Sequence, residues 1–214
     1  MSDTTFNREK KTDRPVIALC YDFDKTLSPD DMQAQGYIQT VQPEGSDMIG
    51  DFWRESNGRA TANNMDKNLA YMYTMKKKAR GQIVFTKEKL AEYGSQVALF
   101  PGVEDWFKRI RDYGADKGII VEHYIISSGL KEMIEGTSIA KEFKELYATS
   151  FYFDDDGVAD KVISNVNGFG DELLFFKKNN NNYHLVLKGS NFSEDGGERI
   201  NDIKNQRVKN MRFL

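Results

Sequence analysis

The chain has 214 residues, and its 33 acidic and 30 basic side chains give a formal net charge of -3 and an isoelectric point near 5.6, which argues against a general nucleic-acid binder. That length suits one domain with a sizeable insertion or two small domains, and no apolar stretch approaches the roughly 18 residues of a membrane span. A single cysteine, Cys20, excludes a disulfide framework and favours a reducing, cytoplasmic compartment. Residues 1–14 lack the apolar centre of a signal peptide and are predicted to be a flexible tail.

The first predicted element is a buried strand over residues 16–21, an apolar run rich in β-branched and aromatic side chains. Asp22 and Asp24 follow it. Because alternate residues of an extended chain point the same way, both carboxyl groups can face one site. That site lies at the carboxyl end of the strand, where open α/β sheets bind their ligands. Ser28 comes next, with a proline and an acid behind it, and this pattern is typical of a helix N-terminus.

The six residues after the strand, Asp22-Phe-Asp-Lys-Thr-Leu27, resemble the first motif of the haloacid-dehalogenase-like (HAD) hydrolases, D-x-D-x-T-[LV], at every position. The resemblance implies an α/β fold, with a Rossmann-like (HAD) parallel sheet flanked by helices. It also implies a phosphatase chemistry in which Asp22 attacks phosphorus and forms an aspartyl-phosphate. Asp24 would protonate the departing oxygen and later activate water. An acid at that position is typical of the family's phosphatases and phosphomutases, and the match makes Thr26 a candidate for substrate binding.

A cation is part of the same expectation, because two acids beside a phosphate repel it. Mg²⁺ prefers oxygen ligands and can bridge a carboxylate to a phosphate, so the resemblance places it on the Asp22 carboxylate and the Asp24 backbone carbonyl. A third acid should come from a later loop. Gly170-Asp171 is the one Gly-Asp pair in the second half of the chain, so Asp171 is the candidate, although the acid that the family carries after it is missing.

Residues 31–97 are predicted to be helical, with helices over 31–41, 61–80 and from Thr86 to 97, and a loop over 42–50. A helical insertion directly after the first motif resembles the cap of one branch of the family, which closes over the site and selects the substrate. The expected division is therefore a small helical cap over 31–97 and a core made of 15–30 and 98–214. Side chains of the cap that could reach a substrate are Trp53, Arg54, Arg59, Tyr71, Tyr73 and Lys76 to Lys78, although core packing and solvated helix ends account for most such residues.

The chain is predicted to return to the core through a helix from Val103 and a strand over 119–126. The strand closes on Ser127-Ser-Gly-Leu130, which resembles the family's second motif, an apolar strand ending in Ser or Thr. The resemblance gives Ser127 the role of binding a phosphate oxygen, with Ser128 as the rival assignment. Gly129 and backbone N–H groups at the start of a helix over 130–135 would add contacts to the substrate.

A helix over 138–146, a strand over 147–153 and a hairpin turn at residues 154–157 are the last firm predictions. Beyond residue 158 the resemblance is weak, and 158–214 is assigned to the core without a firm element. The lysine that neutralises the phosphate in the family would be Lys161, Lys177 or Lys178, and Lys177 stands as the candidate. The terminal residues 208–214 resemble the strand that would lead into the acidic loop.

The sequence therefore predicts a Mg²⁺-dependent phosphatase acting on a small phosphorylated substrate, with neither nucleic acid nor membrane as a partner. The alternative is a catalytically impaired or truncated HAD-like module that binds a phosphorylated ligand or a protein partner. The weak third and fourth motifs support that alternative, because phosphoryl transfer depends on positioning and charge neutralisation as much as on the nucleophile.

Overall fold

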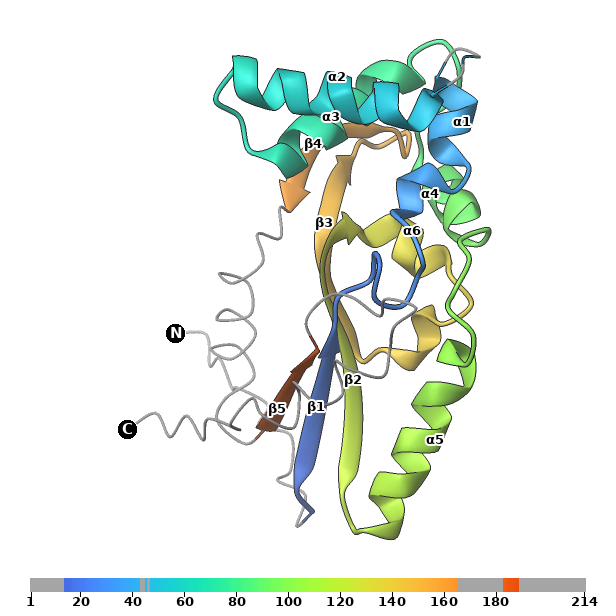
Figure 1. Ribbon diagram of the computed structural model, residues 1–214, viewed down its shortest axis with the longest axis vertical. Helices are drawn as coiled ribbons and strands as arrows, with labels where there is room; N and C mark the ends of the chain where they lie inside the picture. Colours follow the sequence, from blue (N-terminus) through green and yellow to red (C-terminus); the bar gives the residue numbers. More distant parts are fainter. Residues whose placement is uncertain (1–13, 43–44, 46, 165–182, 189–214) are drawn as a thin grey trace.

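The computed structural model describes residues 14–42, 45, 47–164 and 183–188, and their centre is a five-stranded sheet of order β4-β3-β2-β1-β5 (Figure 1). Three neighbouring pairs, β1–β2, β2–β3 and β1–β5, are parallel, and β3–β4 is antiparallel. The strands are β1 (Val16–Tyr21), β2 (Ile120–Leu130), β3 (Glu145–Phe153), β4 (Ala159–Ser164) and β5 (Tyr183–Lys188). The predicted α/β fold with a parallel sheet and flanking helices is confirmed.

Strand β1 lies inside the sheet because its apolar side chains alternate between two packed faces. Ala18 and Cys20 are buried on one face, beside residues of β2. Leu19 and Tyr21 join the larger hydrophobic cluster on the other face. Because β2 and β5 are its parallel neighbours, the carboxyl end of β1, which leads into Asp22, lies beside the carboxyl ends of both.

The helices fall into two groups along the chain. Helix α5 (Val103–Asp116) and the short α6 (Lys131–Gly136) and η2 (Ala140–Glu142) accompany the strands. Between β1 and α5 the chain forms η1 (Met32–Ala34), α1 (Tyr37–Val41), α2 (Met48–Ala62), α3 (Lys67–Ala79) and α4 (Lys87–Gly94). Figure 1 shows α2 and α3 lying across the end of the β3–β4 hairpin. One hydrophobic cluster joins this insertion to the sheet, since it contains Phe52 and Met72 as well as Tyr21 and Ile125.

The helix predictions within the insertion were partly wrong. Residues 31–41 form two short helices, because Gly36 interrupts them with a φ of 125°. No helix begins at Ser28, whose hydroxyl donates to the Asp30 carbonyl instead of capping a helix. The predicted helix over 61–80 begins only at Lys67, because the Asp66 side chain accepts hydrogen bonds from the N–H groups of the next turn and caps α3 there.

Helix α2 was missed, and its buried positions explain why. Phe52, Ser56 and Ala60 face the core at a spacing of four residues, but two of the three are small or polar. The apolar stripe that identifies an amphipathic helix is therefore too weak to read from the sequence. The helix predicted over 138–146 is also wrong: the Lys144 N–H already donates to the His123 carbonyl along β2, so the chain has become extended there.

Other local predictions are confirmed. The Thr86 hydroxyl accepts the Lys89 N–H at 3.2 Å and caps α4, and α5 begins at Val103 after Gly102. Strands β3 and β4 form the predicted hairpin, with Gly157 at a φ of 75° in its turn. The region from residue 158, which had no firm element, contains β4 and β5. No helix in the described part of the chain is both long and apolar enough to cross a membrane.

Candidate active site

The loop after β1 presents two carboxyl groups on one side of the chain. Phe23 is fully buried between Asp22 and Asp24, which are both partly exposed, as the alternation of an extended segment requires. The Phe23 carbonyl then closes the loop by accepting the N–H groups of Thr26, Leu27 and Ser28. Lys25 occupies the left-handed region with a φ of 59°, which allows this tight reversal. The burial of one phenylalanine thus sets the direction of both acids.

The second predicted segment lies at the carboxyl end of the neighbouring strand. Register between β2 and β3 shifts between Ser127 and Leu130, so the residues between them form an irregular turn at the end of the ladder. Ser127 is buried, and its Oγ accepts the Gly129 N–H at 3.0 Å. Bulges of this kind re-aim side chains beside functional sites.

The two segments converge at Gly129. A Cβ atom placed on this glycine would lie 3.1 Å from Asp24 Oδ2 and 3.2 Å from Ser127 Oγ, so both atoms pack directly against its backbone. The Ser127 hydroxyl also stabilises the charged form of Asp22, so these two side chains lie close together. The structure therefore brings together Asp22, Asp24, Ser127 and Gly129, four of the residues that the sequence predicts for the site.

Both acids are desolvated. Burial raises the pKa of Asp22, although hydrogen bonds from the Phe23 N–H, at 2.7 Å, and from Ser127 oppose that shift. Burial also raises the pKa of Asp24 to about 8, and the Met32 N–H, which donates to Asp24 Oδ1 at 2.9 Å, opposes it. The negative charge of Asp31 raises both values further.

No lysine or arginine in the described part of the chain forms an ion pair with either acid. Lys25 is the nearest basic side chain in sequence, but its Nζ turns outward to Asp31, at 3.0 Å. Two desolvated carboxyl groups without a positive partner are the donor chemistry that a hard divalent cation prefers. The Asp22 carboxylate thus fits Mg²⁺ as one ligand, and the Asp24 backbone carbonyl would be a second, which leaves the Asp24 carboxyl free for proton transfer. The described residues contain no cluster of three His, Cys, Asp or Glu side chains that could hold a metal ion, so a third acid would have to come from elsewhere.

The other predicted substrate contacts differ in how open they are. Thr26 is buried, and its Oγ1 has no hydrogen-bond partner among the described residues. Ser128 is exposed, so its side chain is open to solvent beside the site. The Gly129 N–H donates to Ser127 Oγ, so this N–H is used within the protein and is not open to a substrate. Between the rival serines, the geometry favours Ser127, because its Oγ and Asp24 Oδ2 lie against the same stretch of Gly129 backbone.

Tyr71 reaches this site from the helical insertion. Its hydroxyl donates to the Ser128 carbonyl at 2.8 Å, across 57 positions of sequence. Burial raises the pKa of Tyr71, and the charge of Asp24 adds to that shift, which places the phenol within electrostatic reach of the acid. In the sequence, Tyr71 is only one of several cap residues that could reach a substrate. Its position in the helical pattern does not distinguish it from a tyrosine of the core.

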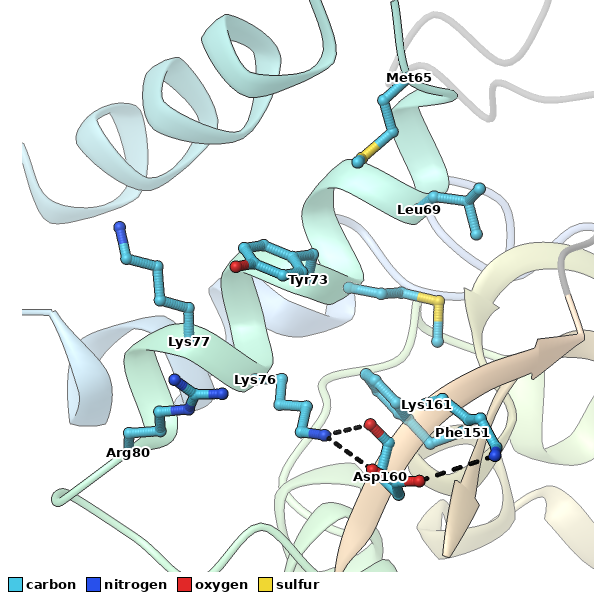
Figure 2. A pocket seen from close by; sticks show the side chains of 10 residues that line it. Met65, Leu69, Tyr73, Lys76, Lys77, Arg80, Phe151, Asp160 and Lys161 are labelled. Carbon is cyan, nitrogen blue, oxygen red and sulfur yellow. Dashed lines mark hydrogen bonds and ion pairs between the residues drawn. The ribbon is translucent and has the colours of Figure 1, made fainter. Parts of the chain in front are cut away.

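A separate hollow of about 290 Å³ lies between α3 and the β3–β4 hairpin (Figure 2). Lys76 and Lys161 both turn toward Asp160 there, and Figure 2 shows Phe151 on the hairpin side. None of the acids or serines predicted for the site lines this hollow. Lys161, one of the three candidate lysines, therefore sits on strand β4 at the edge of the sheet, three strands from β1.

The remaining candidates, Lys177, Lys178 and Asp171, lie outside the described residues, as do residues 208–214 and residues 1–13 of the tail predicted over 1–14. The sheet nevertheless shows which strand flanks β1 on its second side. It is β5, whose Lys188 pairs with Tyr21, the residue before Asp22. The carboxyl ends of β1 and β5 therefore meet, and Asp171 precedes β5 in the chain.

No protein-family model matches the sequence. An uncharacterized protein of Borreliella burgdorferi is 27% identical over 197 residues, which make up 80% of this chain and 67% of that protein. Among solved structures, a phosphoserine phosphohydrolase-like protein from Francisella tularensis is 15% identical, with a TM-score of 0.48 over 69% of this chain. A probable phosphoserine phosphatase from Vibrio cholerae is 14% identical, with a TM-score of 0.49 over 84% of this chain. The chain spans 64% and 52% of the length of those two structures.

Proposed function

We propose that this chain is a HAD-like phosphohydrolase that cleaves a small phosphomonoester through an aspartyl-phosphate on Asp22. The observation that carries the proposal is the convergence of Asp22, Asp24 and Ser127 around the backbone of Gly129, at the adjoining carboxyl ends of two parallel strands. The complete match of residues 22–27 to the first HAD motif supports the same chemistry.

Each of the three side chains has a role in the proposed reaction. An Asp22 carboxylate oxygen forms a bond to phosphorus while the bond from phosphorus to the ester oxygen breaks. Asp24 gives its proton to the departing oxygen. In the second half, Asp24 takes a proton from water as the water attacks phosphorus, and the bond between Asp22 and phosphorus breaks. The Ser127 hydroxyl, which lies close to Asp22, would donate to a phosphoryl oxygen and hold the group in line.

The Asp22 carboxylate and the Asp24 backbone carbonyl are the described groups that would hold Mg²⁺, which would neutralise the phosphoryl charge. For the third acid, the pairing of Lys188 with Tyr21 favours the segment that follows β5 over Asp171, which precedes it. The first acids after Lys188 in the sequence are Glu194 and Asp195. We therefore propose that the missing ligand comes from that segment, which lies outside the described residues.

The helices between β1 and α5 are proposed to act as a cap that selects the substrate. Tyr71 of α3 already contacts the turn that carries Ser127, so the insertion lies against the site. Closure of a cap over an active site excludes water and completes the contacts to the substrate.

The test is hydrolysis of p-nitrophenyl phosphate with and without Mg²⁺. Asp22→Asn should abolish turnover, because a carboxamide is a far poorer nucleophile than a carboxylate. Asp112→Asn, at an exposed acid of α5, is the matched control and should keep the wild-type rate. Glu194→Gln and Asp195→Asn should raise the Mg²⁺ concentration needed for half-maximal rate, and Asp171→Asn should not. Turnover that survives both chelation of Mg²⁺ and Asp22→Asn would rule out the proposed mechanism.

A binding module without catalysis is the second candidate, and one observation favours it. Neither acid has a lysine or arginine partner among the described residues, so the positive charge that phosphoryl transfer requires is not evident there. Such a module would bind inorganic phosphate, measured by calorimetry in the presence of Mg²⁺, and show no hydrolysis of p-nitrophenyl phosphate. Phosphate binding accompanied by Mg²⁺-dependent turnover would exclude it.

A further inference from the structure

We propose that Tyr71 is a positioning residue, which ties the helical insertion to the turn after β2 and thereby fixes the orientation of Ser127. This inference rests on the proposed function and adds to it a residue from outside the two sequence motifs. It starts from the backbone of Ser128, which leaves the regular ladder between β2 and β3.

The Ser128 carbonyl is held by side chains. Because the register shifts between Ser127 and Leu130, this carbonyl is displaced from the regular strand pairing. Two hydroxyl groups donate to it: Tyr71 at 2.8 Å and Thr149 at 2.9 Å. Thr149 comes from the adjacent strand β3 and Tyr71 from α3, so one donor belongs to the sheet and the other to the insertion. Backbone polar groups removed from a ladder need such partners.

The same peptide unit carries the group that holds Ser127. The Ser128 carbonyl and the Gly129 N–H lie in one planar peptide, so fixing one end fixes the direction of the other. The Gly129 N–H donates to Ser127 Oγ at 3.0 Å. Ser127 Oγ and Asp24 Oδ2 lie 3.2 and 3.1 Å from a Cβ placed on Gly129, so the position of this peptide sets where the hydroxyl lies beside the acids. Tyr71 therefore acts on Ser127 through a single rigid peptide, without contact with the reacting atoms.

The tyrosine itself is well fixed. Only 6% of Tyr71 is exposed, and its ring meets the Trp53 ring edge-on, with centroids 6.0 Å apart. Helix α3 is anchored further along by the Tyr37 hydroxyl, which donates to the Met75 carbonyl at 2.6 Å. The position of α3 is thus transmitted to the Ser128 carbonyl with little freedom, as a positioning contact requires.

The experiment compares Tyr71→Phe with Tyr73→Phe under Mg²⁺-dependent hydrolysis of p-nitrophenyl phosphate. Tyr71→Phe removes one hydroxyl and keeps the buried ring. Tyr73 lies on the same helix, is 52% exposed and keeps its ring beneath Arg59 as phenylalanine, so it is the matched control. We expect Tyr71→Phe to lower kcat about tenfold with KM within about twofold, because misplacement of a transition-state contact lowers kcat selectively. Tyr73→Phe should match the wild type.

Thr149→Val removes the second donor and tests whether the two act together. The pair of substitutions should lower kcat by more than the product of the single effects, because either donor alone retains part of the orientation. A Tyr71→Phe enzyme that loses thermal stability but keeps the wild-type kcat would show a purely structural role and overturn the proposal.

Amide hydrogen exchange at Gly129 separates this proposal from the proposed function. If the wild type shows no turnover, the phosphohydrolase assignment fails. Faster exchange of the Gly129 N–H in Tyr71→Phe than in Tyr73→Phe would then still support the proposal that Tyr71 fixes the peptide between Ser128 and Gly129. Equal exchange in the two variants would overturn the positioning role, whatever the activity.

Discussion

At the scale of single residues, the candidate site depends on a position without a side chain. Gly129 lets Asp24 and Ser127 approach the same stretch of backbone, at distances from a built Cβ that are tighter than ordinary contact. The residues that carry chemistry come from the ends of two different strands, and this glycine is where those ends touch. Glycine is required here because it leaves room for these two side chains, and not for its conformational freedom, since its φ does not fall in the left-handed region.

Gly129→Ala should therefore damage activity more than stability. The new methyl group would lie 2.5 Å from Met32 Cε, the flexible end of a side chain, but also 3.1 Å from Asp24 Oδ2, which the Met32 N–H holds in place. We expect a loss of about 1–3 kcal/mol in the free energy of unfolding. The loss in kcat/KM should be about 10²-fold, because the acid and the serine are displaced. Urea unfolding and p-nitrophenyl phosphate kinetics measure the two, and unchanged kinetics would contradict this account of the site.

At the scale of elements, the insertion is locked to the sheet layer by a contact between two helices. Helix α4 belongs to the insertion and α6 follows the second motif. A Cβ on Gly94 would lie 1.9 Å from the Met133 carbonyl oxygen, and a Cβ on Gly136 would lie 2.0 Å from the Ala91 carbonyl oxygen. The two backbones thus touch through a reciprocal pair of glycines, an approach that side chains would prevent.

Gly94→Ala should destabilise the protein strongly, because the obstructing atom belongs to the backbone and cannot turn aside. We expect a loss of about 3 kcal/mol or more in the free energy of unfolding, the upper end for overpacking. Gly58→Ala in α2 is the control, since nothing lies within 4 Å of its Cβ. It should gain about 0.4–1 kcal/mol through the reduced entropy of the unfolded chain. Urea unfolding of both variants decides the matter: similar free energies would mean that α4 and α6 do not pack through these glycines.

At the scale of the whole molecule, a buried histidine couples stability to pH. His123 of β2 is 1% exposed and lies against the rings of Tyr21 and Phe107. The Trp106 N–H donates to the Tyr21 hydroxyl, which leaves that hydroxyl free to donate to His123 Nδ1 at 3.0 Å. Burial lowers the pKa of His123 to about 4, the positive charge of Arg111 adds to the shift, and the Phe107 backbone and the Glu142 charge oppose it. The histidine is therefore neutral in the folded protein.

Stability should fall as the pH falls from about 6.5 toward about 4, the interval in which the unfolded chain protonates its histidine and the folded protein does not. The contribution should be on the order of 1 kcal/mol, reduced by solvent screening. His123→Gln keeps an acceptor for Tyr21 and removes the titration. Asp24, with its pKa raised to about 8, changes the free energy of unfolding with pH in the opposite direction. Its contribution is the same in the wild type and in His123→Gln, so it cancels when the two proteins are compared. Urea unfolding at about pH 7.5 and about pH 5 should show a smaller loss for His123→Gln than for the wild type; equal losses would argue that His123 does not titrate as described.

Much of the site could be predicted from the sequence, because its signals are local. The alternation that places Asp22 and Asp24 on one side acts over three residues, and the buried Phe23 between them confirms it. Ser127 was found for the same reason, as a polar residue at the end of an apolar strand. The Thr86 cap and the turn at Gly157 are likewise short-range chemistry, and both are confirmed.

What the sequence could not decide is which distant segments meet. Nothing near Tyr71 distinguishes it from a core tyrosine, and only the packing of α3 brings its hydroxyl to the Ser128 carbonyl. Helix α2 packs on the core mainly through small or polar residues, so no apolar pattern in the sequence predicts it. The strand beside β1 lies at 183–188, because hydrogen bonding across the sheet selects it. By itself the sequence determined the motif, the strand ends and the direction of the acids, since these follow from neighbours along the chain. The tertiary structure alone decided which strand flanks the acids and which helix reaches them, because those choices depend on burial shared between residues far apart in the chain.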